Sequence, residues 1–209
     1  CIRDRISGLD YAFPDAATIG GVASPHNAPH GSLLLDDKVV TGAVICSIGG
    51  DWRLDTVVAQ GCRPIGPVFS IEQVQRNVLL QLSDGERRDT PVACLPRVLA
   101  GLNSADRERV RHSLFLGIER RNLQLNPDHP VENDGAFLVR NLIGVDPKNG
   151  AVAVADRVRP GMNVQFQLRE ADASREEALS LLQAAAAADD NAPVFGLLMA
   201  CLGRGKGLF

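Results

Sequence analysis

The strongest constraint on the fold is a pair of apolar segments in the second half of the chain that flank a short turn. Residues 137–143 and 151–155 are rich in β-branched and apolar side chains, and the turn-forming run Asp146-Pro147-Lys148-Asn149-Gly150 lies between them. This arrangement is typical of a β-hairpin, whose two strands are antiparallel. Any fold proposed for the chain must therefore contain antiparallel pairing in this region.

Other segments carry the patterns of strands and helices. Val164, Phe166 and Leu168 alternate with polar residues, so we expect a strand that buries only one face. Ser174 and Glu177 have the spacing of a capping box, which predicts that a helix starts at Ser174. Further strands are expected over 33–35, 39–48, 52–58, 68–71, 78–82, 113–118 and 194–201, and helices at the start of the chain and over 91–102 and 104–112. Consecutive strands with a few helices predict an α+β fold, mostly antiparallel sheet with flanking helices.

Composition and charge argue against some classes of function. The chain of 209 residues is 45% hydrophobic and 22% charged, as expected of a packed globular protein. Its formal net charge is −3 and only 4% of its residues are aromatic, so neither a basic stripe nor stacking platforms for nucleic acid are indicated. No apolar run approaches the roughly 20 residues of a membrane-spanning helix. Nucleic-acid binding and a transmembrane segment are not expected.

The five cysteines show no paired spacing. They stand at positions 1, 46, 62, 94 and 201, and none forms a Cys-x-x-Cys pair. This pattern predicts neither a structural zinc site nor a disulfide framework, and it favours free thiols in a reducing, intracellular compartment. The Ala- and Arg-rich composition leaves a plastid location open beside the cytoplasm. Since residue 1 is a Cys, we expect the chain to be part of a longer product.

The first candidate site is the rigid segment 60–67, which contains Pro64, Gly66 and Pro67. We predict a turn-rich loop that holds Cys62 and Arg63 in fixed positions. The guanidinium of Arg63 is suited to bidentate binding of a carboxylate. From the residues alone, a purely structural corner between strands is the favoured alternative.

The second candidate site is the glycine-rich segment Cys201-Leu202-Gly203-Arg204-Gly205-Lys206-Gly207. Glycines at alternate positions allow backbone N–H groups to converge on an anion, and Arg204 and Lys206 add positive charge. The spacing is neither that of a Walker loop nor that of a dinucleotide fingerprint. A flexible connector is an equal alternative.

Catalytic patterns are missing, so we do not expect an enzyme and assign no catalytic residue. Nucleophile elbows, metalloprotease His pairs and a His partner for Cys62 are not recognisable in the sequence. No metal site is predicted. Haem is kept as an alternative cofactor, with His26, His30, Cys46, Cys62 or Cys201 as the axial ligand, because nothing in the spacing selects one of them.

Four segments, in order, resemble the FIST family of sensory domains. They are Gly20-Gly21-Val22-Ala23-Ser24, Gly61 to Pro67, Phe137 to Pro147, and Cys201-Leu202-Gly203-Arg204-Gly205. The resemblance implies two sub-domains: residues 1–75 as the end of the family's N-terminal half, and residues 76–209 as most of its C-terminal half.

The resemblance also implies an intracellular, ligand-binding role in signal transduction. The expected ligand is small, with an amino acid as one option, and the expected ligand-binding residues are Cys62, Arg63, Cys201, Gly203, Arg204 and Gly205. Two alternatives follow from the same family. One is a protein–protein interaction module or adaptor, including substrate recruitment to a ubiquitin ligase, and the other is a haem-based gas sensor.

Overall fold

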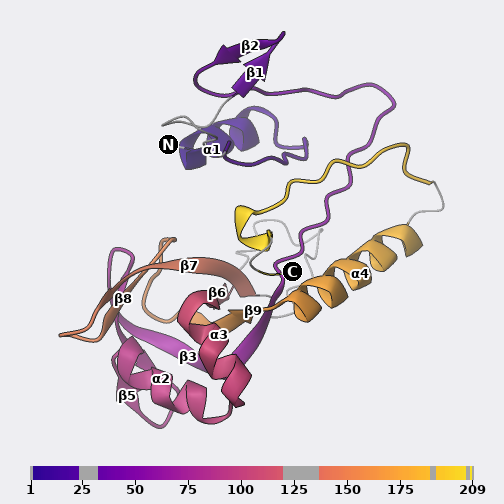
Figure 1. Ribbon diagram of the computed structural model, residues 1–209. Helices are drawn as coiled ribbons and strands as arrows, with labels where there is room; N and C mark the ends of the chain where they lie inside the picture. The colour runs from indigo at the N-terminus through magenta and orange to yellow at the C-terminus, as the bar shows by residue number, and fades with distance from the viewer. Residues whose placement is uncertain (1, 24–32, 120–136, 189–191, 206–207, 209) are drawn as a thin grey trace. The chain divides into compact units, whose positions relative to one another are not determined.

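The chain divides into two compact units that are described separately. The computed structural model describes residues 2–23, 33–119, 137–188, 192–205 and 208 (Figure 1). Unit 1 combines Cys1–Val58 with Leu181–Phe209, and unit 2 is Ala59–Ser180.

Unit 2 is built around an antiparallel sheet that closes on itself. Its strands are β3 (Cys62–Gln75), β4 (Val78–Ser83), β5 (Arg88–Asp89), β6 (Leu114–Glu119), β7 (Phe137–Asp146), β8 (Ala151–Val154) and β9 (Asn163–Arg169). They pair in the order β3-β9-β6-β7-β8-β4-β5, and β3 also pairs with β4. The β3–β4 pairing therefore closes six strands into a small barrel, with β5 attached to the outside edge of β4.

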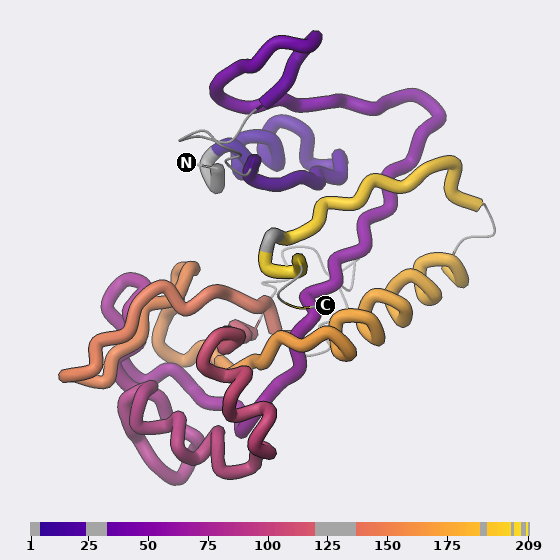
Figure 2. Tube along the Cα trace, in the orientation of Figure 1, coloured from indigo at the N-terminus to yellow at the C-terminus, as the bar shows by residue number. Residues whose placement is uncertain are grey.

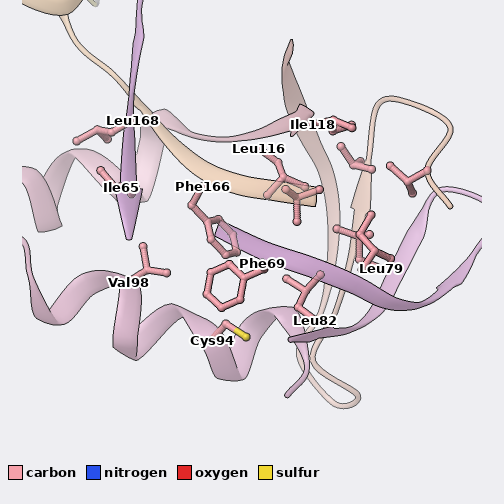
Figure 3. Close-up of a cluster of buried hydrophobic side chains, with 14 residues drawn as sticks. Ile65, Phe69, Leu79, Leu82, Cys94, Val98, Leu116, Ile118, Phe166 and Leu168 are labelled. Atoms are coloured by element: carbon pink, nitrogen blue, oxygen red, sulfur yellow. The ribbon is translucent and has the colours of Figure 1, made fainter. Parts of the chain in front are cut away.

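The barrel interior is filled by side chains (Figure 3). Phe69 of β3 and Phe166 of β9 meet edge to face, with ring centroids 5.9 Å apart. Leu116 of β6 and Leu82 of β4 are fully buried beside them. Alternate residues of each strand point inward, which explains why Val164, Phe166 and Leu168 are all buried. The expected strand pattern is confirmed for this face.

Two helices pack against the barrel. Helix α2 (Pro91–Ala100) begins after Thr90, whose hydroxyl accepts from the amide of Ala93, and it lies against β3, β4 and β8. Its side chains Cys94 and Val98 enter the core, Cys94 below Phe69 and Val98 to its side in Figure 3. Helix α3 (Ser104–Ser113) begins after Asn103, whose side chain accepts from the amide of Asp106, and it lies against β6 and β9.

Helix α4 (Ala171–Ala187) follows β9 without a loop and leads out of unit 2 (Figure 2). It begins three residues before the predicted start. Ser174 is buried inside the first turn and is not the cap, and the amide of Ser174 donates to the carbonyl of Glu170. The capping-box prediction was therefore wrong. The Glu177 side chain forms another contact, which is described below.

Unit 1 has less regular structure. Its described elements are α1 (Ile2–Ala12), β1 (Leu33–Leu35), β2 (Lys38–Val40) and the short 3-10 helix η1 (Leu202–Arg204). β1 and β2 form a two-stranded antiparallel ribbon. Trp52 and Phe195 contact each other with ring centroids 5.8 Å apart, which brings the two parts of the unit together.

The predicted fold class is confirmed: the chain is α+β, its sheets are antiparallel and helices flank them. The predicted hairpin is β7–β8, and the helices expected over 91–102 and 104–112 are α2 and α3. Three strand predictions in unit 1 were wrong or too long, because 41–48, 52–58 and 194–201 form no strand in the described structure. Their composition suits a strand, but a strand also needs a hydrogen-bonded neighbour. The loop expected over residues 122–135 lies outside the described residues.

The segment predicted as a rigid loop is instead the first part of β3. Pairing with β9 is interrupted between Pro64 and Val68, which marks a β-bulge. Gly66 lies in the bulge with φ +68°, and added side-chain atoms would lie 3.0 Å from Val98. Pro67, which lacks an N–H donor, is tolerated because it lies within this break, and Pro64 is the last paired residue before it.

Candidate functional site

Cys62 and Arg63 are the first two residues of β3, and both are half-buried. In the ladder with β9, Cys62 lies opposite Arg169 and Arg63 opposite Leu168. The start of β3 is therefore paired with the end of β9, and a single residue separates that end from helix α4. The segment was predicted to hold Cys62 and Arg63 in place as a loop, whereas here they belong to a strand of a closed sheet.

Arg63 binds two carboxylates of the protein itself. Its Nη2 donates to Oδ2 of Asp106 in α3 across 2.6 Å, and its Nε donates to Oε1 of Glu170 across 2.8 Å. Arg109 lies 3.1 Å from Asp106 and 3.6 Å from Glu170. We call these four residues the charge cluster. It joins β3, α3 and the residue that precedes α4.

The charge cluster is electrically balanced. Burial alone lowers the pKa of Arg63, but the hydrogen bonds and charges of Asp106 and Glu170 outweigh it, so that the pKa lies above its usual value. Asp106 is only 5% exposed, and two arginines compensate its charge. The guanidinium of Arg63 is thus a permanent cation whose partners are already supplied by the fold.

The residues before Arg63 tie the same corner to two other elements. The amide of Gly61 donates to Oε2 of Glu177 in α4. The side-chain amide of Gln60 forms two hydrogen bonds with β7: Nε2 donates to the carbonyl of Phe137 across 2.7 Å, and Oε1 accepts from the amide of Val139 across 2.6 Å. The Cys62 thiol lies 3.6 Å from the carbonyl of Gln60. Neither Gln60 nor Glu177 was predicted from the sequence to make these contacts.

Arg169 is a further functional candidate that sequence reasoning missed. Its guanidinium lies over the ring of Phe115, with the central carbon 4.1 Å from the ring centroid. The Nε atom is buried and has no hydrogen-bond partner. The alternation along β9 placed Arg169 on the outward face, but it gave no sign that the side chain would be covered. Gln167 on the same face is likewise buried, at 4% exposure, against the expectation that this face is open.

The other predicted site residues belong to unit 1. Cys201, Gly203 and Gly205 are exposed and Arg204 is half-buried, around the single turn of η1. The amide of Arg204 donates to the carbonyl of Cys201 across 2.9 Å. Segment 194–201, which leads into this turn, was expected to be a buried strand, but it has no regular secondary structure and is exposed. Within the described units, Cys62 and Arg63 lie together, and the association of this pair with Cys201 and Arg204 stays a prediction.

The candidate metal and haem ligands lie partly within and partly outside the described residues. His26, His30 and His129 lie outside the described residues, and His112 is exposed on α3. Within the described ranges, no group of three His, Cys, Asp or Glu residues has the arrangement of a metal site. Cys46 and Cys201 are exposed and Cys94 is buried. Haem binding therefore stays a prediction.

Among the described residues, no helix has both the length and the apolar character needed to cross a bilayer.

Comparison with known proteins supports the family resemblance that the four ordered segments indicated. The FIST N domain model matches residues 2–85, and the FIST C domain model matches residues 91–208. The predicted division between residues 75 and 76 stays a prediction, since these matches do not fix a structural boundary.

Similar sequences occur in mycobacteria. Uncharacterized protein MT0656 of Mycobacterium tuberculosis is 32% identical over 98% of this chain, and uncharacterized protein Mb0898c of Mycobacterium bovis is 30% identical over 94% of it. The matched regions are 51% and 49% of these relatives, so the chain spans about half of their length. No solved structure matches the chain. From the two domain models, which together cover nearly its whole length, the chain belongs to the FIST family of signal-transduction sensory domains.

Proposed function

We propose that this chain is an intracellular sensory domain that binds a small carboxylate ligand, such as an amino acid, and passes the binding event to a signalling partner. In unit 2 the ligand site is the corner where β3 starts and β9 ends, at Cys62 and Arg63. The glycine-rich turn with Cys201, Gly203, Arg204 and Gly205 belongs to unit 1 and is a second proposed ligand-binding segment. The proposal assigns no catalytic step.

One observation carries the proposal: the corner is bound to α4 by two carboxylates. Glu170, directly before α4, accepts from Arg63, and Glu177, inside α4, accepts from the amide of Gly61. Helix α4 is the element by which the chain leaves unit 2. A ligand that binds beside Cys62 changes the surroundings of both contacts, so it alters the position or stability of α4. This is the differential contact that coupling between a site and a distant readout requires.

The experiment that tests the proposal is a thermal-shift screen of the purified chain with the protein amino acids and with simple organic carboxylates such as benzoate. A ligand that binds only the folded state raises the melting temperature in a concentration-dependent way. Arg63→Ala and Arg204→Ala are each expected to weaken this response. Unchanged ligand-induced stabilisation in both variants contradicts the assignment of the two arginines.

A second candidate function, an adaptor or interaction module, is favoured by the apolar surface of unit 1. The buried hydrophobic residues of the described structure all lie between Ile65 and Val158 or in β9, hence in unit 2. In unit 1, Val194 is 80% exposed, Leu198 92% and Val39 72%. Val194 and Leu198 belong to a continuous run of exposed apolar side chains over residues 194–199, and contiguous exposed apolar surface is typical of a site that another protein covers. A stoichiometric complex that is insensitive to small carboxylates, measured by light scattering after native purification, supports this candidate over the sensor.

A further inference from the structure

We propose that Arg169 is the residue that anchors the carboxylate of the ligand, on the outer wall of the barrel beside Cys62. The inference rests on the proposed function and deepens it, since it says which cation the ligand meets and where. It starts from the observation that Arg63, the arginine singled out by the sequence, already binds two carboxylates of the protein.

Arg169 lacks the partners that Arg63 has. In the part of the chain that the structure describes, no carboxylate lies within ion-pair distance of Arg169. Its Nε–H is buried without an acceptor. A buried donor on a charged group that finds no acceptor is strongly unfavourable, so such a group is rare unless something else supplies the acceptor.

Arg97 shows why the missing carboxylate matters. Its Nε is also buried without a partner, but its Nη atoms lie 3.0 Å from Asp84 and 3.1 Å from Asp89. The charge of Arg97 is therefore compensated within the fold. Of these two arginines with an unsatisfied Nε, Arg169 is the one whose charge the described residues leave uncompensated.

The surroundings of Arg169 hold its guanidinium in place. Phe115 of β6 lies under the guanidinium plane at 4.1 Å, and Cys62 lies directly across the ladder. Stacking on an aromatic ring fixes the plane of the guanidinium and leaves its edge for hydrogen bonds. A planar, fixed donor edge is suited to the two oxygens of a carboxylate.

The wall around Arg169 is shaped by small and polar groups. Gly117 of β6 allows the Gln167 side chain to lie against the strand, because a Cβ at position 117 would lie 2.9 Å from Nε2 of Gln167 and 2.8 Å from Cβ of Phe137. Arg169 and Cys62, both half-buried, and the buried Gln167 thus lie together on the outward, polar face of β9 and its neighbour β3. The ligand class that fits is a small organic carboxylate with a further polar group, as in an amino acid.

The position of Arg169 also explains how binding would reach α4. Arg169 is followed by Glu170 of the charge cluster and then by the first residue of α4. A carboxylate held by Arg169 fixes the backbone directly before Glu170 and helix α4. Arg169 is therefore both an anchor for the ligand and a neighbour of the contacts that hold the helix.

The test compares Arg169→Gln and Arg169→Lys with the matched control Arg159→Gln, which removes an exposed arginine of the same unit. Affinity for the amino acid or carboxylate that gives the largest thermal shift is measured by isothermal titration. We expect Arg169→Gln to weaken binding roughly 10- to 100-fold, as for the loss of a charged hydrogen-bonded pair. We expect Arg169→Lys to be intermediate, because it keeps the charge without the planar fork. The control should bind like the unmodified chain.

Binding that is unchanged in Arg169→Gln overturns this inference while the proposed function stands. If none of the probes binds the unmodified chain, the proposed function fails together with the inference. A second measurement keeps the test independent of variant folding: in the unmodified chain with nitrogen-15 label, the Nε–H resonance of Arg169 must shift on titration with the probe. A stationary Arg169 resonance in the presence of bound probe also overturns the inference.

Discussion

Arg63 donates from Nη2 to Oδ2 of Asp106 across 2.6 Å, and this contact joins the first turn of helix α3 to the start of strand β3. Asp106 is almost completely buried, and its amide is also the group that Asn103 caps. Asp106 therefore contributes to the start of helix α3, to the charge cluster and to the corner with Cys62.

Asp106→Asn should destabilise the chain by about 2 kcal/mol, because it leaves Arg63 and Arg109 with one carboxylate between them in a half-buried site. Urea unfolding followed by circular dichroism measures the change. The matched control is Asp172→Asn, which breaks an exposed pair with Arg175 and should cost less than about 0.5 kcal/mol. Equal effects of the two substitutions would mean that the charge cluster contributes little to stability.

Gly150→Ala should be much more harmful than Gly161→Ala. Both glycines have positive φ, at +70° and +80°, so each substitution has a backbone cost of about 1 kcal/mol. At Gly150 a new Cβ would also lie 2.2 Å from Oγ1 of Thr90, the residue that caps α2, whereas at Gly161 nothing lies within 4 Å. The steric conflict adds about 1–3 kcal/mol. Melting temperatures of the two variants check this, and a Gly161→Ala variant that is the less stable would contradict the packing at Thr90.

Gln60→Ala should loosen the first half of β7. It removes both hydrogen bonds between the Gln60 amide and the backbone of Phe137 and Val139, at about 1 kcal/mol each. Hydrogen exchange at the Val139 amide should become faster, while Gln73→Ala, an exposed position in β3, should leave it unchanged. Unaltered protection of Val139 would show that Gln60 does not hold this strand edge.

Cys94 should be inert in the folded chain. Burial, only partly offset by the hydrogen bond from Arg97, raises the pKa of the Cys94 thiol, so the reactive thiolate is suppressed. Because the folded pKa lies above the unfolded one, this contribution to stability is present below the unfolded pKa and is lost as the pH rises through the folded pKa. Peptide mapping after treatment with iodoacetamide should find the exposed Cys46 and Cys201 modified, and Cys94 modified only after unfolding. Rapid labelling of Cys94 under native conditions would contradict the core packing.

The antiparallel sheet and its flanking helices could be predicted from the sequence, but the closure of the sheet into a barrel could not. Strands β6, β8 and β9 follow from their apolar patterns, and the turn between β7 and β8 from Asp146 to Gly150. The start of β3 was mistaken for a loop because Pro64, Gly66 and Pro67 signal a break, and a β-bulge uses the same residues without ending the strand. The barrel closes because β3 pairs with both β4 and β9. This pairing leaves no local signal in the sequences of the three strands.

The candidate site shows the same limit. Cys62 and Arg63 were identified, but Asp106 and Glu170, the partners of Arg63, and Glu177, the partner of the Gly61 amide, lie 43 or more residues away and carry no local sign of these contacts. Only the ladder between β3 and β9 brings them together. The strand patterns at 52–58 and 194–201 failed for the opposite reason: a local preference for strand was present, and a neighbouring strand was not found in the described structure.

The most direct test of the sensory account is hydrogen exchange along α4, measured by mass spectrometry with and without the amino acid or carboxylate that stabilises the chain. Glu170 and Glu177 connect the ligand corner to this helix, so we expect the exchange rates of Ala171 to Ser180 to change on binding, and the change to be lost in Arg169→Gln. Exchange that is identical along the whole helix, at probe concentrations that saturate the site, would contradict the claim that binding at the corner is transmitted through α4.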